Sequence, residues 1–120
     1  MSQEPLPAIP IIDESALEWR DHPRFSGIRM KQMLTSAANP QASVNRVQVP
    51  PGSVIGWHHH AEQVETVYVL AGQGVLTLGE TEKPFDAGQI VAIPAALVHT
   101  LRNEGSTPLE LLCFFTPPLA

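Results

Sequence analysis

Turn-forming residues interrupt this chain at close intervals from residue 40 to its end. The 120 residues include 12 prolines and 8 glycines, and the segments between them are mostly too short for an α-helix. Those segments are rich in β-branched and apolar residues, which is typical of strands. Many short strands between turn signals predict an all-β fold, an antiparallel sandwich or barrel. The expected strands are 44–49, 53–60, 64–70, 74–78, 89–93, 98–102 and 109–115.

The N-terminal part of the chain has a different pattern. Three prolines within the first ten residues predict an extended arm over residues 1–15, and one barrel domain is expected over residues 16–120. The segment DESALEWRDH, residues 13–22, is the one competitor for helix, because Asp13 or Ser15 could cap a short turn. Trp19 could equally begin a strand. At most a short helical turn is therefore expected before the barrel.

Charge and hydropathy exclude several classes of partner. The chain has 12 acidic against 7 basic residues, a formal net charge of -5, and no cluster of lysine or arginine that could neutralise phosphates, so no nucleic-acid partner is expected. No apolar stretch approaches the roughly 20 residues of a membrane span, and the start of the chain lacks the features of a signal peptide. A cytoplasmic protein is predicted. The single cysteine, Cys113, is interpreted as a small buried hydrophobe.

Three of the five histidines are consecutive. Side chains alternate along a strand, so His58 and His60 share one face while His59 takes the other. Glu65 opens the next expected strand and could lie beside that pair, and His99 could add a third imidazole. Imidazoles with one carboxylate suit Fe, Mn, Ni, Cu or Zn better than Ca or Mg. The sequence therefore indicates a site for one divalent transition metal.

Each of these residues also has an ordinary explanation. A histidine among apolar residues is often a hydrogen-bonded core residue, as His99 could be, and Glu65 could be a solvated charge at a strand end. The triplet could lie on the surface by chance, and His22 is interpreted in that way. The metal site is preferred because three separate ordinary explanations would all have to be true at once. The spacing of the residues would then fit a metal site only by coincidence.

Two stretches of the chain resemble the two motifs of the cupin superfamily, in its small single-domain form. Residues 52–72, GSVIGWHHHAEQVETVYVLAG, match the first motif, and residues 88–103, GQIVAIPAALVHTLRN, match the second apart from Ala96, which stands where the motif has glycine. Alanine adopts a left-handed backbone less easily than glycine, so this departure affects the turn before His99. The matched positions are Gly52, His58, His60, Glu65, Gly72, Gly88, Pro94, His99 and Asn103.

The resemblance implies a jelly-roll barrel of two antiparallel sheets with a metal inside it. By similarity, the metal ligands are His58, His60, Glu65 and His99, and the matched glycines, Pro94 and Asn103 serve the turns. Strand alternation predicts mainly apolar pocket walls around this metal. They are expected from Val54 and Gly56 on the His58 face and from Val67 and Val69 on the Glu65 face.

The expected function is that of a metal-dependent oxygenase or lyase, which the resemblance to cupin dioxygenases and decarboxylases suggests. Three imidazoles and a carboxylate leave two positions of an octahedral metal open for a small oxygen-rich or enolisable molecule. Zinc in four-coordination would instead be closed and structural. No general base is evident, and Glu62 is interpreted as a solvated loop acid. Two alternatives stay open: a non-enzymatic small-molecule-binding protein, and a sugar isomerase or epimerase.

The last expected strand predicts an association between two copies of the chain. Leu111, Cys113 and Phe115 share one face of this strand, while Leu112 and Phe114 share the other. One face can pack on the core, and the other needs cover. A homodimer is therefore expected.

Overall fold

The computed structural model describes residues 8–120, and ten β-strands make up nearly all the regular structure in this part of the chain. One 3-10 helix, η1 (Glu14–Ala16), precedes them. Nothing helical within residues 8–120 has the length and apolar character of a membrane span. In chain order the strands are β1 (Arg20–Asp21), β2 (Arg29–Leu34), β3 (Ser43–Val49), β4 (Val54–His58), β5 (Val64–Ala71), β6 (Gln73–Leu78), β7 (Thr81–Asp86), β8 (Ile90–Ile93), β9 (His99–Arg102) and β10 (Leu109–Thr116).

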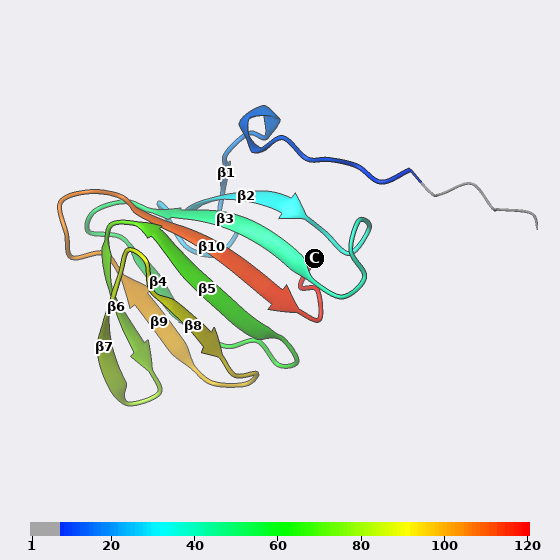
Figure 1. The fold of residues 1–120 in the computed structure, drawn as a ribbon. Helices are drawn as coiled ribbons and strands as arrows, with labels where there is room; N and C mark the ends of the chain where they lie inside the picture. Colours follow the sequence, from blue (N-terminus) through cyan, green and yellow to red (C-terminus); the bar gives the residue numbers. More distant parts are fainter. Residues whose placement is uncertain (1–7) are drawn as a thin grey trace, which may run out of the picture.

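The strands form two antiparallel sheets, one above the other in Figure 1. The larger sheet has the order β1-β2-β3-β10-β5-β8, and the smaller has the order β4-β9-β6-β7. The last strand, β10, lies between β3 and β5 and pairs antiparallel with both. Strands that are distant in sequence are thus neighbours in space, as in a jelly roll. The predicted all-β jelly roll of two antiparallel sheets is confirmed.

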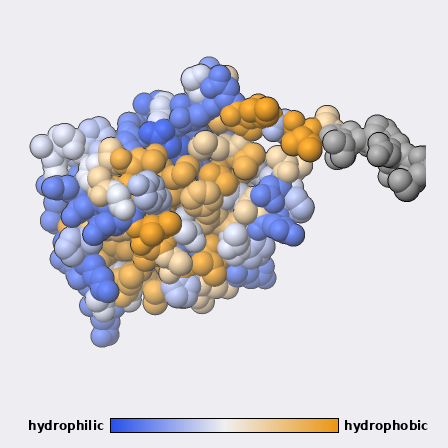
Figure 2. Space-filling model, viewed as in Figure 1, coloured by the Kyte–Doolittle hydropathy of each residue, from blue (hydrophilic) through white to orange (hydrophobic). Residues whose placement is uncertain are grey.

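Alternation along β10 shows how the sequence builds the centre of the larger sheet. The odd-numbered residues from Leu109 to Phe115 are buried, whereas Leu112 and Phe114 are half-buried on the outer face. The predicted division into a core face and an outer face is therefore confirmed. Further apolar surface lies exposed on the arm, at Ile9 and Ile11, and Figure 2 shows hydrophobic surface there and at the centre of the same view. That a second copy of the chain covers the outer face of β10 stays a prediction.

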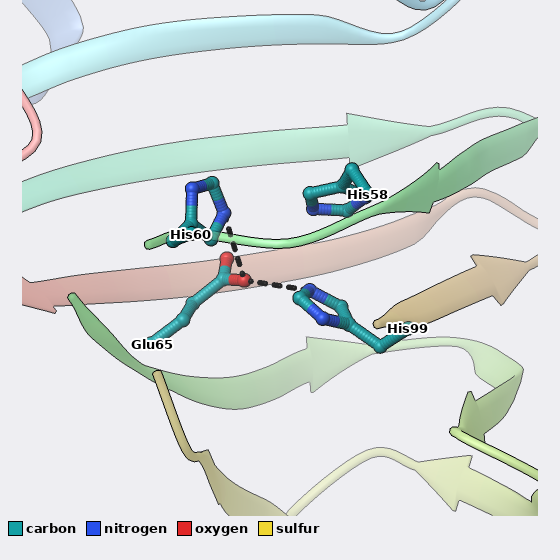
Figure 3. A group of neighbouring side chains, drawn as sticks. All are labelled: His58, His60, Glu65 and His99. Atoms are coloured by element: carbon teal, nitrogen blue, oxygen red, sulfur yellow. Dashed lines mark hydrogen bonds and ion pairs between the residues drawn. The ribbon is translucent and has the colours of Figure 1, made fainter. Parts of the chain in front are cut away.

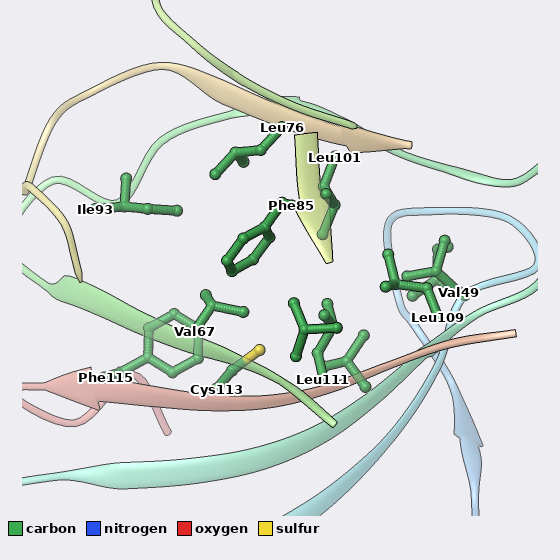
Figure 4. Close-up of a cluster of buried hydrophobic side chains, with 13 residues drawn as sticks. Val49, Val67, Leu76, Phe85, Ile93, Leu101, Leu109, Leu111, Cys113 and Phe115 are labelled. Carbon is green, nitrogen blue, oxygen red and sulfur yellow. The ribbon is translucent and has the colours of Figure 1, made fainter. Parts of the chain in front are cut away.

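The hydrophobic core joins the two sheets. Figure 4 shows its side chains converging from both sides. Full burial of one large aliphatic or aromatic side chain contributes about 1.5–3 kcal/mol, so the cluster holds the sheets together. Its members are Ile28, Val47, Val49, Val67, Val69, Leu76, Phe85, Ile93, Leu101, Leu109, Leu111, Cys113 and Phe115.

Two longer strands were not expected from the sequence. β2 has the sequence RMKQML, which lacks the β-branched residues that indicated the other strands. β7 has the sequence TEKPFD, in which Pro84 cannot donate a ladder hydrogen bond. The structure accommodates Pro84 because β7 is an edge strand that pairs with β6 alone.

The helix considered for residues 13–22 forms only as η1. Asp13 caps it, since the Asp13 carboxylate accepts a hydrogen bond of 3.0 Å from the Ser15 backbone N–H. The chain then extends, because Trp19 packs beneath cationic side chains of the larger sheet, with Nζ of Lys31 4.8 Å from its ring centroid. The short β1 follows at once. Residues 1–7 of the expected arm lie outside the described residues, and the arm–barrel boundary stays a prediction.

Candidate metal centre

Four side chains from separate segments meet between the two sheets. His58 is the last residue of β4, His60 lies in the turn that follows, Glu65 is in β5, and His99 is the first residue of β9. Each offers a nitrogen or oxygen atom, and these atoms all lie within 4.8 Å of one another. Figure 3 shows the four side chains pointing toward a common centre. The structure thus brings together all four residues that the sequence predicts as ligands, in a group able to hold a metal ion.

The geometry of β4 differs from the strand alternation expected for the histidine triplet. β4 ends at His58, so His60 reaches the cluster from a turn rather than from the same strand face. An irregularity also interrupts the pairing of β4 with β9 between Ile55 and His58. One extra residue in a strand reverses the faces of the residues beyond it. His59, which the sequence places on the other face, is exposed.

This irregularity changes one pocket wall. Val54 was expected to line the pocket, but it is 46% exposed and Ile55 lines the cavity instead. The irregularity between Ile55 and His58 brings these two side chains to the same side. On β5, in the other sheet, Val67 lines the cavity as expected, whereas Val69 is buried in the core.

Backbone carbonyls fix two of the imidazole rings. Nδ1 of His58 lies 2.7 Å from the Gly56 carbonyl oxygen, and Nδ1 of His99 lies 2.8 Å from the Leu97 carbonyl oxygen. Because a carbonyl can only accept, both Nδ1 atoms carry the proton and donate it. In the neutral ring, Nε2 then keeps its lone pair for the centre of the cluster. Metal-binding histidines are commonly oriented by this kind of hydrogen bond.

Glu65 lies between His60 and His99. Its Oε1 lies 3.2 Å from Nε2 of His99 and 3.6 Å from Nε2 of His60 (Figure 3). Nε2 of His60 is sealed from solvent and has no hydrogen-bond partner among the described residues. A buried polar atom without a partner is unfavourable, and a metal ion at the centre would supply one. The donor set and the unpartnered nitrogen therefore both fit a divalent transition metal.

The cluster also shifts the acidity of its members before any metal binds. Burial alone would raise the pKa of Glu65, but the positive charges of the His60 and His99 imidazoles and the hydrogen bond with His99 lower it to about 2. Burial likewise acts to lower the pKa of His99, and the hydrogen bonds to Glu65 and to the Leu97 carbonyl outweigh it, so the pKa of His99 is raised. Burial lowers the pKa of His58. A carboxylate that stays ionised beside imidazoles that can lose their protons suits metal binding.

The departure from the second cupin motif lies next to this cluster. Ala96 has a φ of 68°, the left-handed conformation that glycine adopts more readily. Its backbone N–H donates a hydrogen bond of 2.7 Å to the carbonyl of His60. The alanine therefore keeps the turn that glycine would form, and the turn holds the His60 segment in place.

A cavity of about 570 Å³ adjoins the four residues. This volume lies within the range of small-molecule sites. Glu62 is exposed on the loop before β5 and is absent from the cavity wall, in keeping with its interpretation as a solvated acid. The apolar part of the wall consists of Pro23, Phe25, Met30, Val47, Ile55, Val67, Leu76, Phe85, Ile93, Leu101, Leu111, Phe115, Leu119 and Ala120, and Cys113 is also in it.

The segment between β1 and β2 supplies cavity residues that sequence reasoning missed. His22, interpreted as a surface residue, is half-buried and lines the cavity, and its Nδ1 accepts the backbone N–H groups of Arg24 and Phe25. The Phe25 ring lies 5.3 Å from the His58 ring, centroid to centroid. Gly56 makes this approach possible, because a Cβ there would meet Phe25 at 3.2 Å. The one signal in the sequence was an aromatic residue within an otherwise polar loop.

Comparison with known proteins agrees with this architecture. The chain is 32% identical over 87 residues to the oxalate-binding protein of Thermotoga maritima, covering 71% of this chain and 72% of that protein. The crystal structure of a predicted oxalate decarboxylase from Thermotoga maritima has a TM-score of 0.81 and 26% identity, over 90% of this chain and 99% of that one. A mannose-1-phosphate guanylyltransferase of Klebsiella pneumoniae is 34% identical over 73 residues, 61% of this chain but only 16% of the enzyme.

A family model described as the cupin domain matches residues 45–115, more than half of the chain. This match includes all four clustered side chains. The chain therefore belongs to the cupin family.

Proposed function

We propose that His58, His60, Glu65 and His99 bind one divalent transition metal ion and that the chain is a metal-dependent enzyme of the oxygenase or lyase kind. The substrate class is a small oxygen-rich or enolisable molecule. The observation that carries the proposal is the position of the four side chains, which converge at the wall of a cavity of about 570 Å³. A site of this kind can hold a metal and a substrate side by side.

The metal would supply Lewis-acid activation of substrate oxygens, with positions beyond its four protein ligands open to them. Glu65 contributes a negative charge inside the barrel, where it offsets part of the charge of a divalent ion. The carbonyls of Gly56 and Leu97 hold the rings of His58 and His99 in position. The apolar wall excludes water around the bound molecule, which strengthens electrostatic contacts there.

The matches in Thermotoga maritima support an oxygen-rich substrate. The name of the matched sequence refers to oxalate binding, and the name of the matched crystal structure refers to a predicted oxalate decarboxylase. Oxalate is therefore the first probe to use with this chain. The first of these names also supports the alternative function, a cupin that binds a small molecule without turning it over.

Turnover and binding can be separated in one experiment. The protein is loaded with Fe(II) or Mn(II) and mixed with oxalate and a set of small 2-oxo and 2-hydroxy acids, and oxygen uptake, carbon dioxide release and calorimetric binding are recorded. The proposal predicts metal-dependent turnover of at least one compound, which disappears in His99→Ala and persists in His59→Ala. Binding without turnover of any compound would contradict the enzyme proposal and favour the binding protein. No metal uptake by the wild type would contradict both.

A further inference from the structure

One buried amide faces the cavity from the larger sheet. Asn45 lies in β3, and its residue is only 6% exposed. It is a cavity-lining residue, as is Val47 two positions further along the same face of the strand. Its register partners on the neighbouring strands, Gln32 of β2 and Cys113 of β10, also line the cavity. The side chain of Asn45 is thus part of the inner wall.

Within residues 8–120, this amide has no hydrogen-bond partner. No hydrogen bond among the described residues involves the Asn45 side chain, whereas the buried amide of Asn103 donates to the carbonyls of Val49 and Thr107 and accepts from the N–H of Gly105. Asn45 is also not among the side chains with a sealed, unpartnered atom. Its donor and acceptor atoms therefore remain open to the cavity.

The other polar residues of the cavity wall differ from Asn45. Outside the metal cluster, Arg20, Asp21, Arg24 and Gln32 line the cavity but are exposed, and the half-buried His22 has backbone partners for its Nδ1. They can be solvated without a ligand. A buried amide without a partner is unfavourable for folding, because it loses its hydrogen bonds to water and gains none. Such a residue is expected where a bound molecule supplies the missing partner.

The strand register gives the span between Asn45 and the metal cluster. β3 and β5 lie on either side of β10, so they are separated by two strand spacings, roughly 10 Å. Phe115 of β10 is the register partner of both Ser43 and Glu65, so Asn45 lies two residues along the sheet from the row that contains Glu65. A molecule that touches both sites would have roughly the length of one six-membered ring with a substituent at each end.

We propose that Asn45 is a ligand-binding residue that recognises a hydrogen-bonding group at the distal end of the substrate. The proximal end is a carboxylate or similar oxygen pair at the metal centre, and an apolar body lies between the two. The placement of the proximal carboxylate rests on the proposed metal function. The role of Asn45 at the distal end does not. Oxalate fits it poorly, because oxalate has no apolar body and is far smaller than a cavity of about 570 Å³.

The test uses pairs of carboxylic acids that differ only in a distal hydroxyl group. The pairs are benzoate with 4-hydroxybenzoate, cyclohexanecarboxylate with its trans-4-hydroxy derivative, and butanoate with 4-hydroxybutanoate. Affinities are measured by calorimetry on the metal-loaded wild type and on Asn45→Leu, which keeps the branched shape of the side chain and removes the hydrogen-bonding atoms. For at least one pair, the hydroxyl group should improve binding about tenfold in the wild type and less than threefold in Asn45→Leu.

Gln48→Leu is the matched control, because Gln48 lies on the outer face of the same strand and bonds to Glu110. It should keep the preference for the hydroxylated acid. Asn45→Leu should unfold at an unchanged or higher temperature, since no internal hydrogen bond is lost, and Asn45→Ala gives a second variant should the larger side chain not fit.

Three results would contradict the role of Asn45: no preference for any hydroxylated acid in the wild type, a preference that survives in both Asn45 variants, or no binding of any acid to the metal-loaded protein. Metal content is measured on the same samples. A wild type that takes up no metal would contradict the proposed function. Metal uptake without distal recognition would contradict this inference alone.

Discussion

Nε2 of His60, sealed from solvent and without a hydrogen-bond partner, lies 3.6 Å from Oε1 of Glu65. This distance is too long for a hydrogen bond, although it allows an ion pair when the imidazole is protonated. An unpartnered buried nitrogen costs about 1–3 kcal/mol. A metal ion bound by both atoms would remove that cost and link the turn after β4 to β5.

Metal occupancy should therefore depend on His58, His60 and His99 and be independent of His59. We expect His58→Ala, His60→Ala and His99→Ala to lower metal affinity at least about 100-fold, since even residues that only orient ligands contribute 10–100-fold. His59→Ala is the control, because His59 is exposed. Elemental analysis at neutral pH measures all four variants. Equal loss of metal in the control would contradict the site.

The titration of the metal-free protein should separate two of the histidines. Burial lowers the pKa of His58 below 6.5, and the contacts with Glu65 and the Leu97 carbonyl raise the pKa of His99 above 6.5. Imidazole chemical shifts measured by NMR against pH should show this order. The reverse order, or a common midpoint, would contradict the hydrogen-bond pattern described for the cluster.

Acidification should release the metal through the histidines. The pKa of Glu65 is lowered from 4.5 to about 2, so this carboxylate stays ionised while the imidazoles take up protons. Its contribution to stability is likewise present above pH 4.5 and is lost only as the pH falls toward 2. Below roughly pH 6, we expect metal release with uptake of more than one proton per metal ion. Release coupled to a single proton would contradict a site of three histidines.

The turn before His99 should be more stable with the family's glycine. Ala96→Gly removes the cost of a left-handed alanine, about 1 kcal/mol, and part of this gain is offset by the flexibility of glycine in the unfolded chain. We expect a gain of up to about 1 kcal/mol in the free energy of unfolding in urea. Ala95→Gly is the control and should lower stability by about 0.5–1 kcal/mol. If Ala96→Gly lost as much stability as the control, the claim that the backbone of Ala96 is strained would be refuted.

Two glycines with similar backbone angles should respond differently to alanine. Gly72 has a φ of +92°, and a Cβ there would lie 2.6 Å from the Pro108 carbonyl oxygen, whereas Gly88 has a φ of +86° and open space around it. Gly88→Ala should cost about 1–2 kcal/mol from the backbone alone. Gly72→Ala should cost about 1–3 kcal/mol more, because the backbone at Pro108 must move. Similar unfolding midpoints for the two variants would contradict this close approach.

Much of the fold could be predicted from the sequence because its signals are local. Turn residues and alternation located seven strands, and the motif spacing identified the four clustered residues. β2 was missed because its strand conformation depends on pairing with β3, and β7 because Pro84 is compatible with a strand only at an edge. Tertiary context decided both elements.

The cavity wall was harder to predict than the metal cluster. The irregularity in β4 exchanged Val54 for Ile55, and Gly56, a residue type that often marks a bulge, lies within it but does not specify which side chain faces the cavity. His22 and Asn45 line the cavity because of the way the chain folds around the barrel. Neither their neighbours in sequence nor their spacing indicated that they would face the cavity. The ligands follow a motif, whereas the residues that would select a substrate depend on three-dimensional packing.

The central claim is that three histidines and one glutamate bind a single metal ion, and anomalous X-ray scattering tests it most directly. Crystals of protein purified without chelator or added metal are measured above the absorption edge of the element that X-ray fluorescence identifies. We predict one anomalous peak per chain, about 2.0–2.2 Å from Nε2 of His58, His60 and His99 and from a carboxylate oxygen of Glu65. A stoichiometric metal located elsewhere, or no anomalous peak among these four side chains, would contradict the account.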